Sequence, residues 1–408
     1  GHVGAITALL EAGADVNQLA TDGVSPLHFA SQEGHVGAIT ALLGAGAAVN
    51  QATTRGSTPL HVASQKGHVD AITALLEAGA AVNQAKINGA TPLHVASYGG
   101  HVGAITALLK YGADVNQLAT DIGGVSPLHV ASHNGHVGAI TALLEAGADV
   151  NQPAADGSSP LRFASQKGHV GAITALLGAG ADVNQPATDC LSPLHVASEK
   201  GHEDAIRALL RAGAKVNQPA VRDATPLHFA SQEGHVGAIT ALLGAGAEVN
   251  QSTTDGVSPL HSASHNGHVG AIRALLGAGA EVNQPTTDGV SPLHAASNEG
   301  RADAIRALLE AGAEVNQLTI NGETPLRLVS QRGHQDPERR GDYSKAAIAL
   351  IVADGAINNE AEIMAALWGF PGTEADMLEI IQEEKKAIEE KEAQKRSWSE
   401  LREAWINA

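Results

Sequence analysis

The chain has 408 residues, of which 43 are acidic and 25 basic, so its formal net charge is −18 at pH 7. This charge argues against nucleic-acid binding, which needs clustered Lys and Arg to displace counterions. Only 2% of the residues are aromatic and one is a cysteine. The core must therefore be aliphatic, a disulfide framework is excluded, and the single cysteine agrees with a reducing compartment. No apolar run approaches the ~18 residues of a membrane-spanning helix.

The dipeptide Gly-His recurs along the chain at a nearly fixed interval. Its glycine occupies Gly1, Gly34, Gly67, Gly100, Gly135, Gly168, Gly201, Gly234, Gly267 and Gly333. Gly300 has the same place in the period but is followed by Arg301. Successive glycines are 33 residues apart, except for 35 between Gly100 and Gly135. A period of this size indicates a solenoid, in which each unit buries its apolar face against its neighbours. The sequence therefore predicts a repeat array rather than a globular enzyme.

The unit at residues 25–57 shows how one repeat is built. It opens with Ser25 and Pro26. Ser accepts a hydrogen bond from a free backbone N–H at a helix start, and Pro suits the first helical position because it has no N–H to satisfy. The first helix is predicted to stop near Gly34, since Gly tolerates the left-handed conformation that ends helices.

A second helix follows in the same unit. Its apolar residues fall on one helical face and are Val36, Ile39, Leu42 and Leu43. Gly46 is predicted to end it, and a short extended stretch at residues 49–51 and a turn at 54–56 complete the unit. Each repeat is therefore expected to be two helices and a protruding hairpin-like loop.

The tetrad Ser/Thr-Pro-Leu-His, followed by Ala-Ser-x-x-Gly-His and Leu-Leu-x-x-Gly-Ala-x-Val-Asn, resembles the ankyrin repeat. The tetrad, or its close variant, begins at Ser25, Thr58, Thr91, Ser126, Ser159, Ser192, Thr225, Ser258, Ser291 and Thr324, after a half-repeat at residues 1–17. The resemblance implies an all-α ankyrin-repeat solenoid over residues 1–323. It also implies a protein-binding role without catalysis. The chain begins inside a repeat and without Met, so we expect a longer parent chain.

The repeats depart from the family pattern at two kinds of position. Glycine replaces a helix former in the second helix at Gly4, Gly37, Gly103, Gly138, Gly171, Gly237 and Gly270. Each is expected to cost about 1 kcal/mol relative to Ala. Arg162 and Arg327 replace the tetrad histidine.

The C-terminal part is less regular. Residues 324–358 are interpreted as a degenerate tenth repeat, with residues 335–344 inserted between its helices. Residues 359–408 are predicted to form a helical tail that contains all three tryptophans. This tail is either a cap on the solenoid, a partner-docking segment with Trp398, Leu401 and Trp405 as anchors, or a weak coiled coil.

Eighteen of the 20 histidines lie in the two repeated positions, the tetrad and the Gly-His pair. A residue repeated once per unit is expected to hydrogen-bond neighbouring backbone, not to act at one site. His129 with His133, and His261 with His265, have the i, i+4 spacing of two metal ligands on a helix, but neither pair has the adjacent Glu of a zinc protease. We therefore predict no metal, no cofactor and no catalytic residue.

Positions that vary between repeats are the candidates for partner recognition, although neutral drift at exposed positions would look the same. One set is the residue pair before each Gly-His. The other set is the loop tip of each repeat, and in one repeat this tip is widened by two extra residues near Ile122. The predicted partner-binding residues are Gln65, Lys66, Tyr98, Ile122, His133, Asn134, Gln166, Lys167, Glu199 and Lys200.

The predicted function is that of a non-catalytic intracellular scaffold, cytoplasmic or nuclear and monomeric, which binds a protein partner through the groove and loop tips of the array. One alternative is an adaptor subunit, for example of a ubiquitin ligase, that docks through the tail. Another is a purely structural spacer.

Overall fold

The structure, a computed structural model, describes residues 1–336, 338–354 and 386. The chain divides into two compact units, Gly1–Val221 and Arg222–Ala408, and each is described by itself. The predicted all-α repeat architecture is confirmed. Within the described residues, the only β-type pairing is an isolated antiparallel bridge between Ala119 and Val125.

The first unit contains α1 to α13. Their bounds are α1 (Val3–Glu11), α2 (Pro26–Gln32), α3 (Val36–Gly44), α4 (Pro59–Lys66), α5 (Val69–Glu77), α6 (Pro92–Gly99), α7 (Val102–Lys110), η1 (Thr120–Ile122), α8 (Pro127–His133), α9 (Val137–Glu145), α10 (Pro160–Lys167), α11 (Val170–Gly178), α12 (Pro193–Glu199) and α13 (Glu203–Arg211).

The second unit contains α14 to α21, and a 3-10 turn, η2 (Val221–Asp223), joins the two units. The bounds are α14 (Pro226–Gln232), α15 (Val236–Gly244), α16 (Pro259–Asn266), α17 (Val269–Gly277), α18 (Pro292–Asn298), α19 (Ala302–Glu310), α20 (Pro325–Gln335) and α21 (Arg340–Asp354).

The first helix of each repeat begins at the predicted cap. In α4, Thr58 has extended backbone angles and its side chain accepts a hydrogen bond from the His61 backbone N–H. The His61 ring in turn accepts from the Thr58 backbone N–H, so two free helix-end donors are satisfied reciprocally. The helix ends at Gly67, whose φ of +72° is left-handed, as predicted for this glycine.

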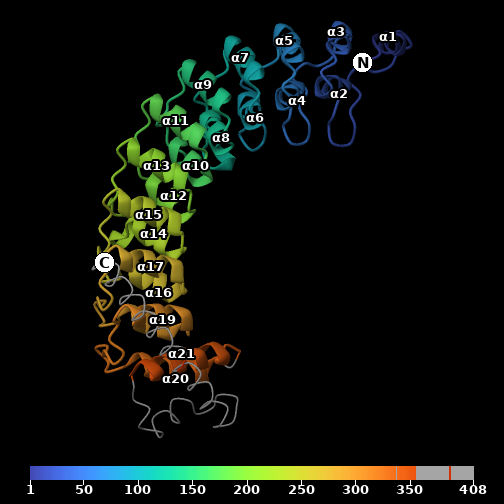
Figure 1. The fold of residues 1–408 in the computed structure, drawn as a ribbon. Coiled ribbons are helices and arrows are strands. Elements are labelled where there is room, and N and C mark those ends of the chain that lie inside the picture. The colour runs from blue at the N-terminus through green and yellow to red at the C-terminus, as the bar shows by residue number, and fades with distance from the viewer. Residues whose placement is uncertain (337, 355–385, 387–408) are drawn as a thin grey trace, which may run out of the picture. The chain divides into compact units, whose positions relative to one another are not determined.

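The helices of each unit form two layers (Figure 1). In Gly1–Val221 the first helices pack in series, α2 on α4, α4 on α6, α6 on α8, α8 on α10 and α10 on α12. The second helices pack likewise from α1 to α13, and each first helix packs on the second helix of its own repeat. The core lies between the layers and is aliphatic, as the low aromatic content predicts; in α5 it contains Ala71, Ile72, Leu75 and Leu76.

The loops between repeats also stack on one another. The Thr54 N–H donates to the Asp22 carbonyl at 2.9 Å, and the Ala155 N–H donates to the Gly123 carbonyl at 2.9 Å. The stretch predicted as extended, residues 49–51, begins instead as a turn. The Gln51 N–H closes this turn by donating to the Ala48 carbonyl at 3.1 Å, and Asn50 Oδ1 accepts from the Ala81 N–H of the next repeat at 2.8 Å.

The second-helix glycines have a packing role that helix propensity alone does not reveal. A Cβ added at Gly171 would lie 2.9 Å from Val137 Cγ2 in the preceding repeat, and one at Gly103 would lie 2.8 Å from Val69 Cγ2. Because these distances are below ordinary van der Waals contact, glycine allows neighbouring second helices to approach closely.

The last described helix pair differs from the predicted one. The segment 335–344, predicted to be inserted between the two helices, lies only partly between them, because α20 continues through Gly333 to Gln335 and α21 already begins at Arg340. Ala347, Ile348 and Ile351 of α21 are buried, as Ala38, Ile39 and Leu42 are in α3.

The predicted tail, residues 359–408, lies outside the described residues apart from Lys386, as does the end of the tenth repeat, residues 355–358. Every helix that the structure describes is too short or too polar to span a bilayer.

Candidate protein-binding surface

Most of the tetrad histidines bond to a loop carbonyl of the next repeat, as predicted, and these are His28, His61, His94, His129, His228, His261 and His294. His61 Nδ1 accepts from the Thr58 backbone N–H at 3.2 Å, so its Nε2 carries the hydrogen and donates to the Ala90 carbonyl at 3.1 Å. Burial lowers the pKa of His61 to about 3, and the nearby Lys86 charge adds to the shift. The ring is therefore a neutral structural group near pH 7.

The same pattern recurs in both units. His129 Nε2 bonds to the Ser158 carbonyl at 3.0 Å, and His261 Nε2 bonds to the Val290 carbonyl at 2.9 Å. Burial lowers the pKa of His129, His228 and His261 to about 4. These histidines are fully occupied with packing and hydrogen bonding.

Arg162, which stands where other repeats have the tetrad histidine, makes the inter-repeat link in another way. Its backbone N–H still bonds to the Ser159 hydroxyl at 3.2 Å, and its guanidinium bonds to the side chains of Ser158 and Asp189. Asp189 belongs to the loop of the next repeat, so the link is retained with an ion pair in place of a ring.

The histidines of the Gly-His pairs form a second ladder. His101 Nε2 donates to the Gln65 carbonyl of the preceding repeat at 2.9 Å, and its ring covers Gly67, where an added Cβ would lie 2.7 Å from the ring. His136 bonds in the same way to the Tyr98 carbonyl at 3.0 Å. Each ring thus anchors the backbone of a residue in the variable pair of the repeat before it.

Two other side chains continue this ladder in the second unit. Arg301 Nε donates to the His265 carbonyl at 3.2 Å, and the Tyr343 hydroxyl donates to the Asn298 carbonyl at 3.1 Å. Tyr343 comes from the inserted segment and packs its ring against Gly300, as the histidines do against their glycines. Sequence reasoning missed this role, because no Gly-His spacing leads to Tyr343.

The loop asparagines form a third ladder. Asn83 Nδ2 donates to the Gly112 carbonyl at 3.1 Å, and Asn83 Oδ1 accepts from the Asp114 N–H at 2.8 Å. Asn17, Asn50 and Asn151 make equivalent pairs of bonds. The two ends of the amide are therefore used to join consecutive loops.

His129 and His133, one of the two pairs with i, i+4 spacing, are taken up by packing and hydrogen bonding. His129 uses both ring nitrogens in the hydrogen bonds described above. His133 packs edge-on against the Phe163 ring, with centroids 5.9 Å apart, and burial lowers its pKa. Within residues 1–336 and 338–354, no three His, Cys, Asp or Glu side chains gather in a group that would hold a metal ion.

The variable pairs that were predicted to bind a partner lie in a row along one unit. They occupy the C-terminal ends of α4, α6, α8, α10 and α12, helices that pack in that order. We call this set the variable row, and it consists of Gln65, Lys66, Tyr98, His133, Asn134, Gln166, Lys167, Glu199 and Lys200. All are exposed except His133, Asn134 and Glu199, which are half-buried.

Tyr98 is the aromatic residue of this row, and 65% of it is exposed. Ile122 is 42% exposed but lies in η1, before the start of α8, whereas Tyr98 lies near the end of α6. A helix of eight residues, such as α6, is about 12 Å long. The structure therefore places Tyr98 and Ile122 at opposite ends of the first-helix layer, and a single partner would have to span that layer to contact both.

Some members of the row bond within the chain. Lys200 Nζ donates to Glu199 Oε1 at 2.7 Å, so their charges offset one another. Asn134 Nδ2 donates to the Val130 carbonyl at 2.8 Å. The side chains of Gln65, Lys66 and Tyr98 are more fully displayed than these.

The residue after each tetrad is a variable position that sequence reasoning missed. It is Phe29 in the first repeat, where 59% of the residue is exposed, and Val62 and Val95 in the next two. In the second unit it is Phe229, then Ser262 and then Ala295. The small side chains of Ser262 and Ala295 help to line a hollow of about 430 Å³. The missed signal was the change of side-chain size at one position of the period.

A family model described as ankyrin repeats (three copies) matches the chain in overlapping segments. The matched segments are residues 1–86, 42–119, 81–154, 117–187, 161–253, 194–286, 227–319 and 260–337. No curated protein shows significant similarity to the chain.

Proposed function

Because the chain belongs to the ankyrin-repeat family, whose arrays are generally protein-interaction modules, we propose that it is a non-catalytic scaffold that binds a protein partner through the variable row and the loop tips. In this proposal the chain acts as a monomer inside the cell. The partner approaches the first-helix layer of Gly1–Val221, and Tyr98 is the main contact.

The observation that carries this proposal is the exposure of Tyr98 on an anchored backbone. The His136 ring holds the Tyr98 carbonyl at 3.0 Å, while 65% of the residue is exposed. Exposed Tyr on a rigid backbone loses little conformational entropy on binding, and Tyr is enriched among residues that dominate interface energetics. The ladders of His and Asn fix the framework, so differences between repeats are displayed mainly at such positions.

The test is a double variant, Tyr98→Ala with Ile122→Ala, in the full chain. Proteins captured by the wild type in cells are compared with those captured by the variant. The affinity of a purified candidate partner is then measured by isothermal titration calorimetry. We expect the double variant to weaken binding at least about tenfold, because truncation of an aromatic anchor costs about 2 kcal/mol or more.

A matched control removes two exposed apolar side chains from the second-helix layer of the same unit. Leu9→Ala with Val170→Ala does this on α1 and α11. It should leave affinity within about twofold of wild type. Unchanged affinity in the Tyr98 and Ile122 variant, or an equal loss in the control, would remove the basis for this surface.

The adaptor alternative depends on Trp398, Leu401 and Trp405, which lie outside the described residues. Limited proteolysis of the purified chain distinguishes a docking tail from a tail that caps the solenoid. Early release of residues 359–408 with the array intact would favour docking through the tail, and protection equal to that of the array would favour a cap.

A further inference from the structure

A cationic cavity lies in the second unit, whereas the variable row belongs to the first. Its volume is about 540 Å³, and its lining includes the side chains of Arg301, Arg306, Arg339 and Lys345 with those of Asp303 and Asp342. Four cationic groups against two carboxylates leave an excess of positive charge, although the whole chain carries a net charge of −18. An excess of positive charge in a cavity favours the binding of an anionic ligand.

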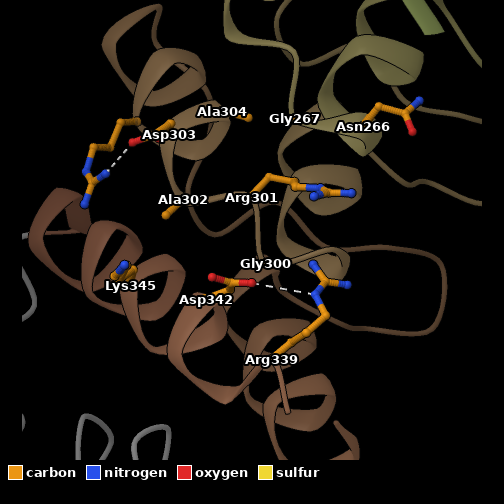
Figure 2. Close-up of a pocket in the computed structure, with 11 residues that line it drawn as sticks. Asn266, Gly267, Gly300, Arg301, Ala302, Asp303, Ala304, Arg339, Asp342 and Lys345 are labelled. Atoms are coloured by element: carbon orange, nitrogen blue, oxygen red, sulfur yellow. Dashed lines mark hydrogen bonds and ion pairs between the residues drawn. The ribbon is translucent and has the colours of Figure 1, made fainter. Parts of the chain in front are cut away.

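The cations come from separate elements of the fold. Arg301 precedes α19, Arg306 lies on that helix, Arg339 precedes α21, and Lys345 lies on α21. Figure 2 shows Arg301, Arg339 and Lys345 around the hollow, with Asp342 between Arg339 and Lys345 in this view. The cluster therefore depends on the packing of α19 against α21 rather than on one run of basic sequence.

Two of the cations are already neutralised. Arg306 bonds to Asp303 at 2.8 Å, and Arg339 lies 3.7 Å from Asp342 and 3.7 Å from Glu299. Arg339 is also held by the Glu299 carbonyl, at 2.6 Å. These contacts orient both guanidinium groups before any ligand arrives.

The other two cations are not neutralised. Arg301 uses its Nε to bond to the His265 carbonyl. In the part of the chain that the structure describes, no carboxylate forms an ion pair with Arg301 or with the exposed Lys345. Arg301 and Lys345 thus line the cavity with two positive charges that no described carboxylate offsets.

We propose that this cavity binds a phosphoserine or phosphothreonine side chain of a partner polypeptide whose flanking residues are neutral or basic. A phosphate monoester carries a charge between −1.5 and −2 near pH 7, which matches the two unpaired cations, and Arg binds its oxygens bidentately. A polyacidic segment fits less well. The acidic chain repels it over the Debye length of about 8 Å at physiological ionic strength.

The repeat itself argues that Arg301 serves more than the fold. Histidine in the same position of the preceding repeat, His268, makes the equivalent bond to the Gln232 carbonyl at 3.0 Å. Arginine therefore keeps the structural bond while adding donors and a permanent charge. The site lies in a different unit from Tyr98. It therefore goes beyond the proposed function, and its phosphopeptide binding can be tested independently of the Tyr98 surface.

The test uses fluorescence anisotropy with the full chain. The probe is a short labelled peptide that carries one phosphoserine between neutral and basic residues. Its unphosphorylated form and its form with Glu in place of the phosphoserine serve as comparison probes. We expect the phosphopeptide to bind at least about tenfold more tightly than either, and to be displaced by inorganic phosphate.

The variant Arg301→His with Lys345→Gln should reduce phosphopeptide affinity at least about tenfold, because it removes both unpaired charges. It should still fold, because histidine serves this position in other repeats. Arg273→Thr is the matched control: Arg273 lies on α17 outside the cavity lining, and Thr occupies its position in several repeats. This control should change affinity by less than about twofold.

Three results would overturn the proposal. The first is equal affinity for the phosphorylated and unphosphorylated peptides, and the second is equal affinity for the phosphopeptide and the Glu peptide. The third is a loss of phosphopeptide affinity in Arg273→Thr as large as that in the Arg301→His with Lys345→Gln variant. A fourth is preferential binding to vesicles that contain an anionic phospholipid, which would assign the cavity to a membrane. Retained phosphopeptide binding in the Tyr98 and Ile122 variant would keep this site separate from the proposed scaffold surface.

Discussion

Acidification should destabilise this protein through its buried tetrad histidines. The pKa of His61 is about 3 in the folded chain and about 6.5 in the unfolded one. As pH falls below about 6.5 the unfolded chain takes up a proton at His61, and the folded chain does not do so until about pH 3. The stability that His61 contributes is therefore complete above pH 6.5 and is lost progressively as pH falls towards 3.

The size of the effect follows from the shift. Between pH 7 and pH 5, His61 alone should lower the free energy of unfolding by about 2 kcal/mol. His129, His228 and His261, each with a pKa of about 4, should contribute nearly as much each. The four together amount to about 7 kcal/mol, which is comparable to the whole stability of many domains.

The assay is urea unfolding at pH 7 and pH 5, followed by far-ultraviolet circular dichroism, on the wild type, His61→Gln and Lys66→Gln. His61→Gln should cost about 1–3 kcal/mol at pH 7, because the Thr58 N–H and the Ala90 carbonyl lose their partner. Its pH-dependent loss should be smaller than that of the wild type by about 2 kcal/mol. The control, Lys66→Gln, changes an exposed side chain and should keep the wild-type pH dependence.

Equal pH dependence in His61→Gln and the wild type would refute this reasoning. A second measurement does not depend on how cooperatively the array unfolds. In a nuclear magnetic resonance titration of the native chain, the His61 ring should remain neutral at pH 5. A ring that titrates near pH 6.5 would show that burial does not control it.

Two further predictions test the contacts between repeats. Gly178→Ala should stabilise the chain by about 0.4–1 kcal/mol, since no atom lies within 4 Å of the added methyl group. Gly171→Ala on the same helix should gain less or lose stability, because its methyl group would lie 2.9 Å from Val137 Cγ2; equal gains in the two thermal melts would contradict the close-approach role. Tyr343→Phe should cost about 1 kcal/mol by losing the hydroxyl bond to the Asn298 carbonyl, and Tyr343→Ala should cost roughly 3–5 kcal/mol by also losing the buried ring. Hydrogen exchange of α19 and α21 reports both variants, and similar exchange in the two would show that the ring does not support this end of the array.

The sequence by itself determined the fold, because each signal was local or strictly periodic. Ser or Thr before Pro set the start of every first helix, and left-handed glycines such as Gly34 and Gly67 set the ends. The 33-residue period predicted that the histidines bond to the backbone of neighbouring repeats, since a residue repeated once per unit meets an equivalent neighbour each time.

Only the tertiary structure decided where these signals act. It showed that second-helix glycines pack against a valine in the second helix of the preceding repeat, a contact that helix propensity does not predict. It brought Tyr343 into the position of a missing histidine, because α20 continues past Gly333 and the inserted segment returns to Gly300.

The candidate sites divide in the same way. The sequence identified the variable row from differences between repeats, but exposure and bonding separated Tyr98, which is displayed, from Asn134, which bonds to its own helix. The cationic cavity was not predicted, because Arg301 and Lys345 are distant in sequence and meet only when α19 packs against α21. Periodic neighbours follow from local pattern, whereas a charge cluster across a degenerate repeat depends on how its irregular helices pack.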